Sequence, residues 1–271
     1  MRIYITTITT ALVALCTLWS GCASLYGDRS NVTTQRNISG FVHLAQVYGR
    51  DFRPATPRGI IELGEAINRF TNVRAEIDDH IFLDSQVLHA YPFIYISVDR
   101  AFTPTREEIA NLKYYLWNGG FAFFENIQFD REYSQAEASL RDMLKKTLGS
   151  NARFRILPNR HKIYHSFFDF DDGPPHSAPS ADPNAIVASI LPPLALGPPP
   201  LEIDEVSFFE GIFLDDRLSV VYSNKAIGQA WEREFRNEPH LKMGVNLVIF
   251  ALTQPRALTA KTQEIYKEMN R

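Results

Sequence analysis

Residues 91–126, YPFIYISVDRAFTPTREEIANLKYYLWNGGFAFFEN, constrain the fold of this chain more than any other segment. The segment contains two short runs rich in aromatic and β-branched residues, at 93–98 and 121–124. Strands that are apolar on both faces are typical of parallel sheets, which helices cover on both sides. The segment therefore predicts a strand, a helix and a second strand parallel to the first.

Between these runs the sequence carries the signals of a helix. Thr103, Pro104, Thr105 and Glu107 are typical of a helix start, where a hydroxyl caps, a proline fits the first turn and an acid faces the positive end of the dipole. The glycine pair at 119–120 is typical of a helix end, because glycine accepts positive φ. The side chains expected to pack on the sheet are Ile109, Leu112, Leu116 and Trp117.

Similar patterns extend this unit along the chain. Further strands are expected at residues 41–48, 73–77 and 154–157, a hairpin at 212–222, and helices at 57–70, 134–148 and 242–253. The predicted fold class is α/β, with a single open, mostly parallel sheet flanked by helices and with a C-terminal hairpin and helix. The proline-rich residues 173–200 predict a loop, and residues 255–271 predict a helical tail.

The first 22 residues have the pattern of a secretion signal. Residues 18–22, LWSGC, resemble a bacterial lipoprotein processing site, in which Cys22 becomes the acylated first residue of the mature protein. An uncleaved anchor or an ordinary cleaved signal is the alternative. Ala23 after the cysteine resembles lipoproteins of an outer membrane, so we expect a lipid anchor that faces the periplasm. Residues 23–39 are polar, as in a flexible tether, and the folded domain is expected at 40–254.

Cysteine content and charge limit the chemistry of the mature chain. The two cysteines, Cys16 and Cys22, both lie in the predicted leader, so the domain has no disulfide, no thiolate nucleophile and no thiolate zinc site. The formal net charge of −3 becomes one unit more negative when the leader is removed, because that step deletes Arg2 and no acid. A mildly acidic chain is not expected to bind nucleic acid, which requires a concentrated basic face.

Five segments occur in the order YPFIYI, WNGGFAFFEN, LPNRHKIYHSFFDF, FEGIFLDDRLSVVYS and MGVNLVIFALT. Together they resemble the DUF4159 family, a bacterial domain of unknown function, over residues 41–253. The resemblance implies a class I glutamine-amidotransferase-like or flavodoxin-like fold, often found with membrane-anchored proteins, and no established activity. After the serine of VVYS the family usually shows an acid two or three residues on, whereas this chain has Asn224, Lys225 and Ala226.

Polar residues come directly after the predicted strands, where open α/β sheets place their ligand crevice. These residues are Asp51, Asp99, Glu125 and Asn126. Carboxylates that share such a crevice would raise one another's pKa or hold a cation. Alternatively, each acid caps a helix or pairs with Arg50 or Arg100. If the acids are crowded together, replacing Glu125 or Asp99 by its amide is expected to leave stability unchanged or to raise it, and to abolish activity.

A loop rich in histidine and aromatic residues follows the strand at 154–157. His161 and His165 are four residues apart, which on a helix would place both on one face as metal ligands or as a base and its partner; their aromatic neighbours favour a loop. Arg217 would either clamp a carboxylate ligand or attach the hairpin to the sheet. Asn246, which is polar within an apolar helix, is expected to be a satisfied core amide.

The chain lacks the motifs G-x-S-x-G, G-x-x-x-x-G-K-[ST], G-x-G-x-x-G and H-E-x-x-H. Cysteine-dependent amidotransferase chemistry is excluded for the mature chain, and neither a cofactor nor a metal is predicted. The sequence favours a non-catalytic binding or scaffolding module of a cell-envelope assembly, with an envelope protein as partner. The alternative is a cysteine-independent hydrolase that acts on a glycan or peptide through Asp99, Glu125 and His165. The candidate ligand-binding residues are Asp51, Asn126 and Arg217.

Overall fold

A computed structural model describes residues 39–128, 134–176 and 208–258. The chain divides into two units after Thr34, and every described residue lies in the second. The described elements are β1 (Ser39–Tyr48), α2 (Gly59–Phe70), β2 (Asn72–Phe82), η1 (Gln86–Ala90), β3 (Phe93–Val98), α3 (Arg106–Trp117), β4 (Phe121–Asn126), α4 (Gln135–Leu148), η2 (Gly149–Asn151), β5 (Arg155–Ile156), η3 (Lys162–His165), β6 (Glu210–Leu214), β7 (Arg217–Ser223), α6 (Ile227–Trp231) and α7 (Glu238–Thr253).

Seven strands of the described residues form one sheet in the order β2-β1-β3-β4-β7-β6-β5. The strands from β2 to β7 pair in parallel, whereas β6 and β5 are antiparallel to their neighbours. The chain runs outward from β1 to β2 and then crosses back to β3, so the strand order reverses between β1 and β3. The α/β class with an open, mostly parallel sheet is therefore confirmed.

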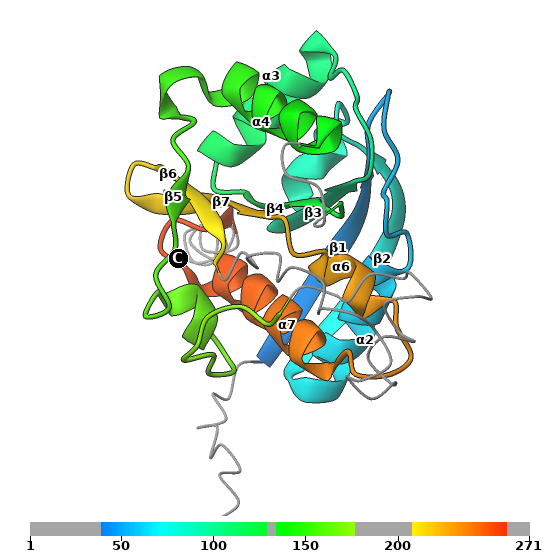
Figure 1. Cartoon of the computed structure of the whole chain (residues 1–271), viewed down its shortest axis with the longest axis vertical. Helices are drawn as coiled ribbons and strands as arrows, with labels where there is room; N and C mark the ends of the chain where they lie inside the picture. Colours follow the sequence, from blue (N-terminus) through cyan, green and yellow to red (C-terminus); the bar gives the residue numbers. More distant parts are fainter. Residues whose placement is uncertain (1–38, 129–133, 177–207, 259–271) are drawn as a thin grey trace, which may run out of the picture. The chain divides into compact units, whose positions relative to one another are not determined.

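Helices cover both faces of the sheet (Figure 1). On one face α2, α6 and α7 pack against a buried cluster that includes Trp231 and the β4 residue Phe123. On the other face α3 and α4 pack against a second cluster that includes Leu116 and Phe124. Successive β4 side chains thus point to opposite faces, as in any strand. Within the described ranges, no helix is long and apolar enough to cross a membrane.

The start of α3 differs in detail from the prediction. The N-cap is Thr105 and not Thr103, because the Thr105 hydroxyl accepts a hydrogen bond from the Glu108 N–H at 3.1 Å. The Glu108 carboxylate in turn accepts one from the Thr105 N–H at 2.7 Å, which completes a capping box. Pro104 therefore precedes the helix instead of occupying its first turn.

The buried face of α3 is also rotated from the prediction. Trp117 is 40% exposed, because Tyr115 and Leu116 take the buried positions of the last turn. The Tyr115 hydroxyl donates to the Phe121 carbonyl at 2.9 Å and accepts from the Phe121 N–H at 3.1 Å. A Cβ at Gly120 would lie 2.3 Å from the Tyr115 ring, so this packing requires glycine.

The predicted C-terminal hairpin and helix are both present. β6 and β7 are joined by a turn in which Asp215 and Asp216 have φ of 46° and 64°. A hairpin turn with two positive φ values usually contains glycine, but aspartate tolerates this conformation better than most residues. Helix α7 begins at Glu238, four residues before the predicted start, and is buried along most of its length.

Candidate functional site

Glu125 lies at the centre of a buried polar network at the carboxyl end of the sheet. It is the second-last residue of β4, level with Ser97 of β3 and Ser223 of β7, and its side chain is fully buried. Its carboxylate accepts four hydrogen bonds: Oε1 from the Ile227 N–H at 2.6 Å and the Ser223 hydroxyl at 3.1 Å, and Oε2 from the Gly228 N–H at 2.7 Å and the Tyr95 hydroxyl at 2.8 Å. Both carboxylate oxygens are therefore occupied within the fold.

These bonds make Glu125 the cap of the short helix α6. Ile227 and Gly228 are the first two residues of α6, and their N–H groups have no carbonyl partner within the helix. Gly228 is required here, because a Cβ at this position would lie 1.8 Å from the Tyr95 hydroxyl oxygen. The same hydroxyl lies 3.0 Å from Oγ1 of Thr56, so the network also holds the loop between β1 and α2.

Burial raises the pKa of Glu125 to about 7, although its hydrogen bonds from Gly228, Tyr95 and other donors favour the charged form. Burial also raises the pKa of Tyr95 well above its usual value, and the nearby carboxylate adds to this effect. A carboxyl group with a pKa near 7 suits general acid–base chemistry at neutral pH. However, Glu125 has no exposed surface and lines neither of the two cavities described below.

The first cavity, which we call the arginine cavity, has a volume of about 680 Å³ and lies at the carboxyl ends of β1, β2 and β3. Its lining includes Tyr48, Arg50, Asp51, Arg53, His80 and Arg100. It is located where the strand order reverses, which is the usual ligand site of an open α/β sheet.

The arginine cavity has an excess of positive charge. The Arg50 Nε lies 2.8 Å from a carboxylate oxygen of Asp84, which neutralises this guanidinium. Arg53 and Arg100 are exposed and form no ion pair with the described residues. The only acid in the lining, Asp51, accepts a hydrogen bond from the Thr103 N–H at 2.8 Å. An anionic group would therefore complement this cavity.

The other predicted strand-end residues lie elsewhere. Asp99 is exposed just after β3 and does not line the arginine cavity. Asn126 is fully buried, and its Oδ1 accepts from the Gln128 N–H at 3.1 Å. The crowded carboxylate site is not formed, because Glu125 is enclosed against α6 whereas Asp51 and Asp99 face solvent. No group of three or more potential metal ligands occurs among the residues that the structure describes.

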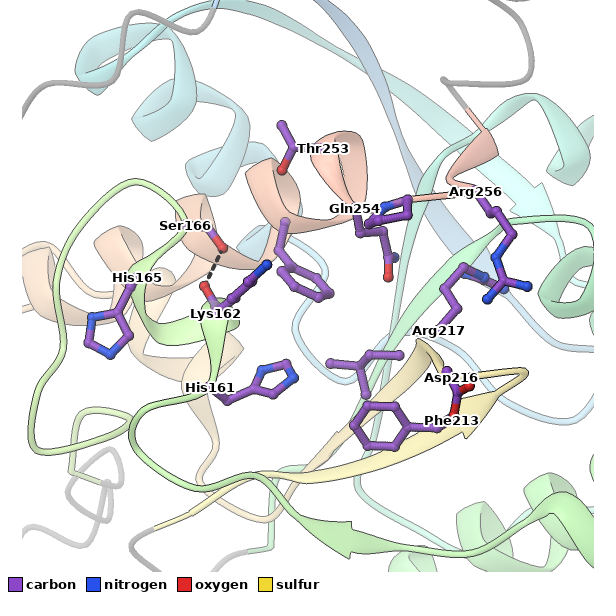
Figure 2. Close-up of a pocket in the computed structure, with 13 residues that line it drawn as sticks. His161, Lys162, His165, Ser166, Phe213, Asp216, Arg217, Thr253, Gln254 and Arg256 are labelled. Carbon is purple, nitrogen blue, oxygen red and sulfur yellow. Dashed lines mark hydrogen bonds between the residues drawn. The ribbon is translucent and has the colours of Figure 1, made fainter.

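The second cavity, which we call the hairpin cavity, has a volume of about 570 Å³ and lies at the amino end of β7 (Figure 2). Three segments line it: the η3 region, the β6–β7 hairpin and the end of α7. The lining residues are His161, Lys162, His165, Ser166, Phe213, Asp216, Arg217, Leu218, Phe250, Thr253, Gln254, Pro255 and Arg256. Sequence patterns gave no sign that these segments meet.

The hairpin cavity is lined by three residues that the sequence had indicated as candidates: His161, His165 and Arg217. His165 Nδ1 lies 3.1 Å from an Asp169 carboxylate oxygen. The Arg217 guanidinium donates to the Gly120 carbonyl at 2.9 Å and also to the Leu116 carbonyl. It therefore attaches the hairpin to the end of α3 and the start of β4. Burial lowers the pKa of Arg217, and the nearby charge of Arg256 adds to this effect.

The three candidate catalytic residues are not brought together. Glu125 is level with Ser223 at the carboxyl end of β7, whereas His165 lines the cavity at the opposite end of this strand, near Arg217. Ser223 is six positions after Arg217 in β7, which corresponds to about 20 Å of extended strand. Asp99 lines neither of these two cavities, so neither of them holds all three side chains.

A family model described as a domain of unknown function, DUF4159, matches residues 41–252. The matched range runs from β1 to the last turn of α7 and includes all the described strands between them. No curated protein matches the chain.

Proposed function

The chain belongs to the DUF4159 family, a domain of unknown function, and we propose that it is a non-catalytic binding module that a lipid on Cys22 holds at the periplasmic side of a bacterial envelope membrane. The proposed binding site is the arginine cavity, and its ligand is an anionic group on an envelope protein. One observation carries this proposal: Arg53 and Arg100 lie at the strand reversal without an acidic partner among the described residues.

The arrangement of polar groups supports binding more than catalysis. Catalysis by Asp99, Glu125 and His165 requires these side chains to reach one substrate. Of the three, only His165 lines either the arginine cavity or the hairpin cavity. Glu125 already accepts four hydrogen bonds, so its oxygens are not available to a substrate while α6 is in place.

The test combines Arg53→Gln with Arg100→Gln in the full-length chain. Both side chains are exposed, so the free energy of unfolding should change by less than about 1 kcal/mol for the pair. The double variant is expected to fail to complement a deletion strain, and Arg106→Gln, which removes another exposed arginine at the start of α3, is expected to complement fully. Full complementation by the double variant would contradict the assignment of the binding site.

The raised pKa of Glu125 is the one observation that favours the alternative, a cysteine-independent hydrolase that acts on a glycan or peptide. Such an enzyme would have to move α6 away from Glu125 in order to admit a substrate. If the chain is a hydrolase, the purified wild type should cleave peptidoglycan fragments and Glu125→Gln should abolish this turnover. If the chain is a binding module, the wild type should release no product from these fragments.

A further inference from the structure

We propose that the hairpin cavity is a second binding site, which takes a small organic anion with a flat apolar body, such as an aromatic carboxylate. This site is separate from the arginine cavity, because the two lie at opposite ends of the parallel strands. The inference therefore goes beyond the proposed function and does not depend on it.

The first argument is an uncompensated pair of guanidinium groups. In Figure 2 the side chains of Arg217 and Arg256 lie near each other at one end of the cavity. Their charges interact, since Arg256 helps to lower the pKa of Arg217 after the larger effect of burial. The hydrogen bonds of Arg217 go to backbone carbonyls, and those of Arg256 to the Asp215 carbonyl, so neither cation has a carboxylate partner among the described residues. A bound carboxylate would neutralise both.

The second argument is the side chain of Gln254, which lies just beyond the end of α7. Gln254 is only 6% exposed, and its amide nitrogen is buried without a hydrogen-bond partner in the described structure. Figure 2 shows this side chain pointing into the cavity. A buried amide nitrogen without a hydrogen-bond acceptor costs free energy. A carboxylate in the cavity would give the amide nitrogen an acceptor.

The third argument is the aromatic part of the cavity lining. The His161 ring contacts both Phe213 and Phe250, with centroid distances of 6.2 Å and 5.7 Å. Burial lowers the pKa of His161, and the charge of Lys162 lowers it further, which favours the neutral imidazole. Its Nδ1 accepts from the Ile163 N–H at 3.2 Å. The three rings therefore form an uncharged surface that suits a flat apolar group.

The overall charge of the lining agrees with an anionic ligand. Lys162, Arg217 and Arg256 are cations, and Asp216 is the acid among the residues that line the cavity. The imidazole of His165, a further basic side chain of the lining, lies 3.1 Å from a carboxylate oxygen of Asp169. A neutral ligand would leave this excess of positive charge uncompensated.

The experiment measures binding of benzoate to the full chain by isothermal titration, with benzamide and inorganic phosphate as comparison ligands. Benzoate has both a carboxylate and a flat ring, whereas benzamide lacks the charge and phosphate lacks the ring. We expect a dissociation constant on the order of 1 mM for benzoate, as is usual for so small a ligand, and binding at least about tenfold weaker for the other two. Equal binding of benzoate and phosphate would overturn the proposed ligand class.

Two variants locate the site without disturbing the bonds of Arg217 to α3. Gln254→Met removes the amide but keeps the shape of the side chain, and Arg256→Gln removes one of the paired cations. Each should weaken benzoate binding by about tenfold, the loss expected for one polar contact. Gln254→Met should also raise the melting temperature, because it removes a buried amide nitrogen that has no partner.

Arg106→Gln is the matched control, since it removes an exposed arginine outside both cavities, and it should bind benzoate like the wild type. Loss of binding in the Arg53→Gln, Arg100→Gln double variant, with normal binding in Arg256→Gln, would place the anion in the arginine cavity and overturn the inference. Absence of benzoate binding to the wild type would overturn it as well.

Discussion

Glutamine in place of Glu125 is expected to destabilise the fold. At pH 5 the protonated carboxyl can donate its single hydrogen to a hydroxyl, such as that of Tyr95 or Ser223, and still accept from the N–H groups of Ile227 and Gly228. A glutamine amide must instead point its NH₂ group at one of these N–H groups. We therefore expect Glu125→Gln to lower the free energy of unfolding by about 1–3 kcal/mol at pH 5, measured by urea unfolding.

Asp99→Asn provides the control for this measurement. Asp99 is exposed, so its amide variant should stay within about 0.5 kcal/mol of the wild type. The sequence led us to expect that both amide variants would be neutral or stabilising, and the four donors around Glu125 reverse the expected sign for that residue. If Glu125→Gln is as stable as the wild type at pH 5, Glu125 does not cap α6.

The stability of the wild type should depend on pH through Glu125. Because burial raises the pKa of this carboxyl from 4.5 to about 7, the folded chain holds a proton in this window that the unfolded chain releases. The free energy of unfolding therefore falls as the pH rises from 4.5 to 7, by on the order of 3 kcal/mol from this group. Urea unfolding across this range should show the stability advantage of the wild type over Glu125→Gln narrowing as the pH rises. A constant difference would contradict the raised pKa.

At the scale of residues, the sequence could indicate that a side chain is buried, but it seldom indicated its hydrogen-bond partners. Asn246 was expected to be a satisfied core amide, and this is confirmed: it donates to the Phe168 carbonyl at 2.8 Å and accepts from the Phe168 N–H at 2.8 Å. Glu125 could not be interpreted in this way, since its partner Gly228 lies 103 residues later in the chain. Gln254 gave no local signal, because its environment is formed by the hairpin and the η3 region.

Helix α3 offers a direct test of capping at the scale of an element. Thr105→Ala removes the hydroxyl that accepts from the Glu108 N–H and should lower the free energy of unfolding by about 1 kcal/mol. Thr103→Ala is the matched control, because Thr103 is exposed and its backbone N–H, which bonds to Asp51, is retained. Thermal unfolding of the two variants distinguishes them. A larger loss in Thr103→Ala would indicate that the helix is capped at Thr103.

Elements were predictable where the determining contacts are local. β3 occupies 93–98 as predicted, since its run of apolar residues is bounded by polar or proline residues on both sides. α6 was not predicted, because five residues are too few for a periodic pattern and its first N–H groups depend on Glu125. The strand expected at 154–157 shortens to β5, Arg155–Ile156, at the antiparallel edge of the sheet, where it has one neighbouring strand.

At the scale of the whole molecule, the sequence predicted parallel strands with a crevice at their carboxyl ends, but not their order. The order places the reversal between β1 and β3 and so determines where the arginine cavity lies. Because successive side chains of β4 point to opposite faces of the sheet, Glu125 points towards α6 and away from the face that α3 and α4 cover. The hydrolase alternative required His165 to lie beside Asp99 and Glu125, but contacts of residues 159–168 with α7 place it in the hairpin cavity instead.

The last prediction concerns the attachment of the whole chain to a membrane. Residues 18–22 resemble a lipoprotein processing site, and Cys22 follows two small residues. If Cys22 is acylated, cells that express the wild type should incorporate labelled palmitate into the protein. Cys22→Ala should incorporate none. It should also leave the membrane fraction, because it lacks the residue that carries the acyl chains of the anchor. Cys16→Ala is the matched control and should label normally, since it alters the other cysteine of the chain. Equal labelling of wild type and Cys22→Ala, or no labelling of either, would contradict the lipid anchor.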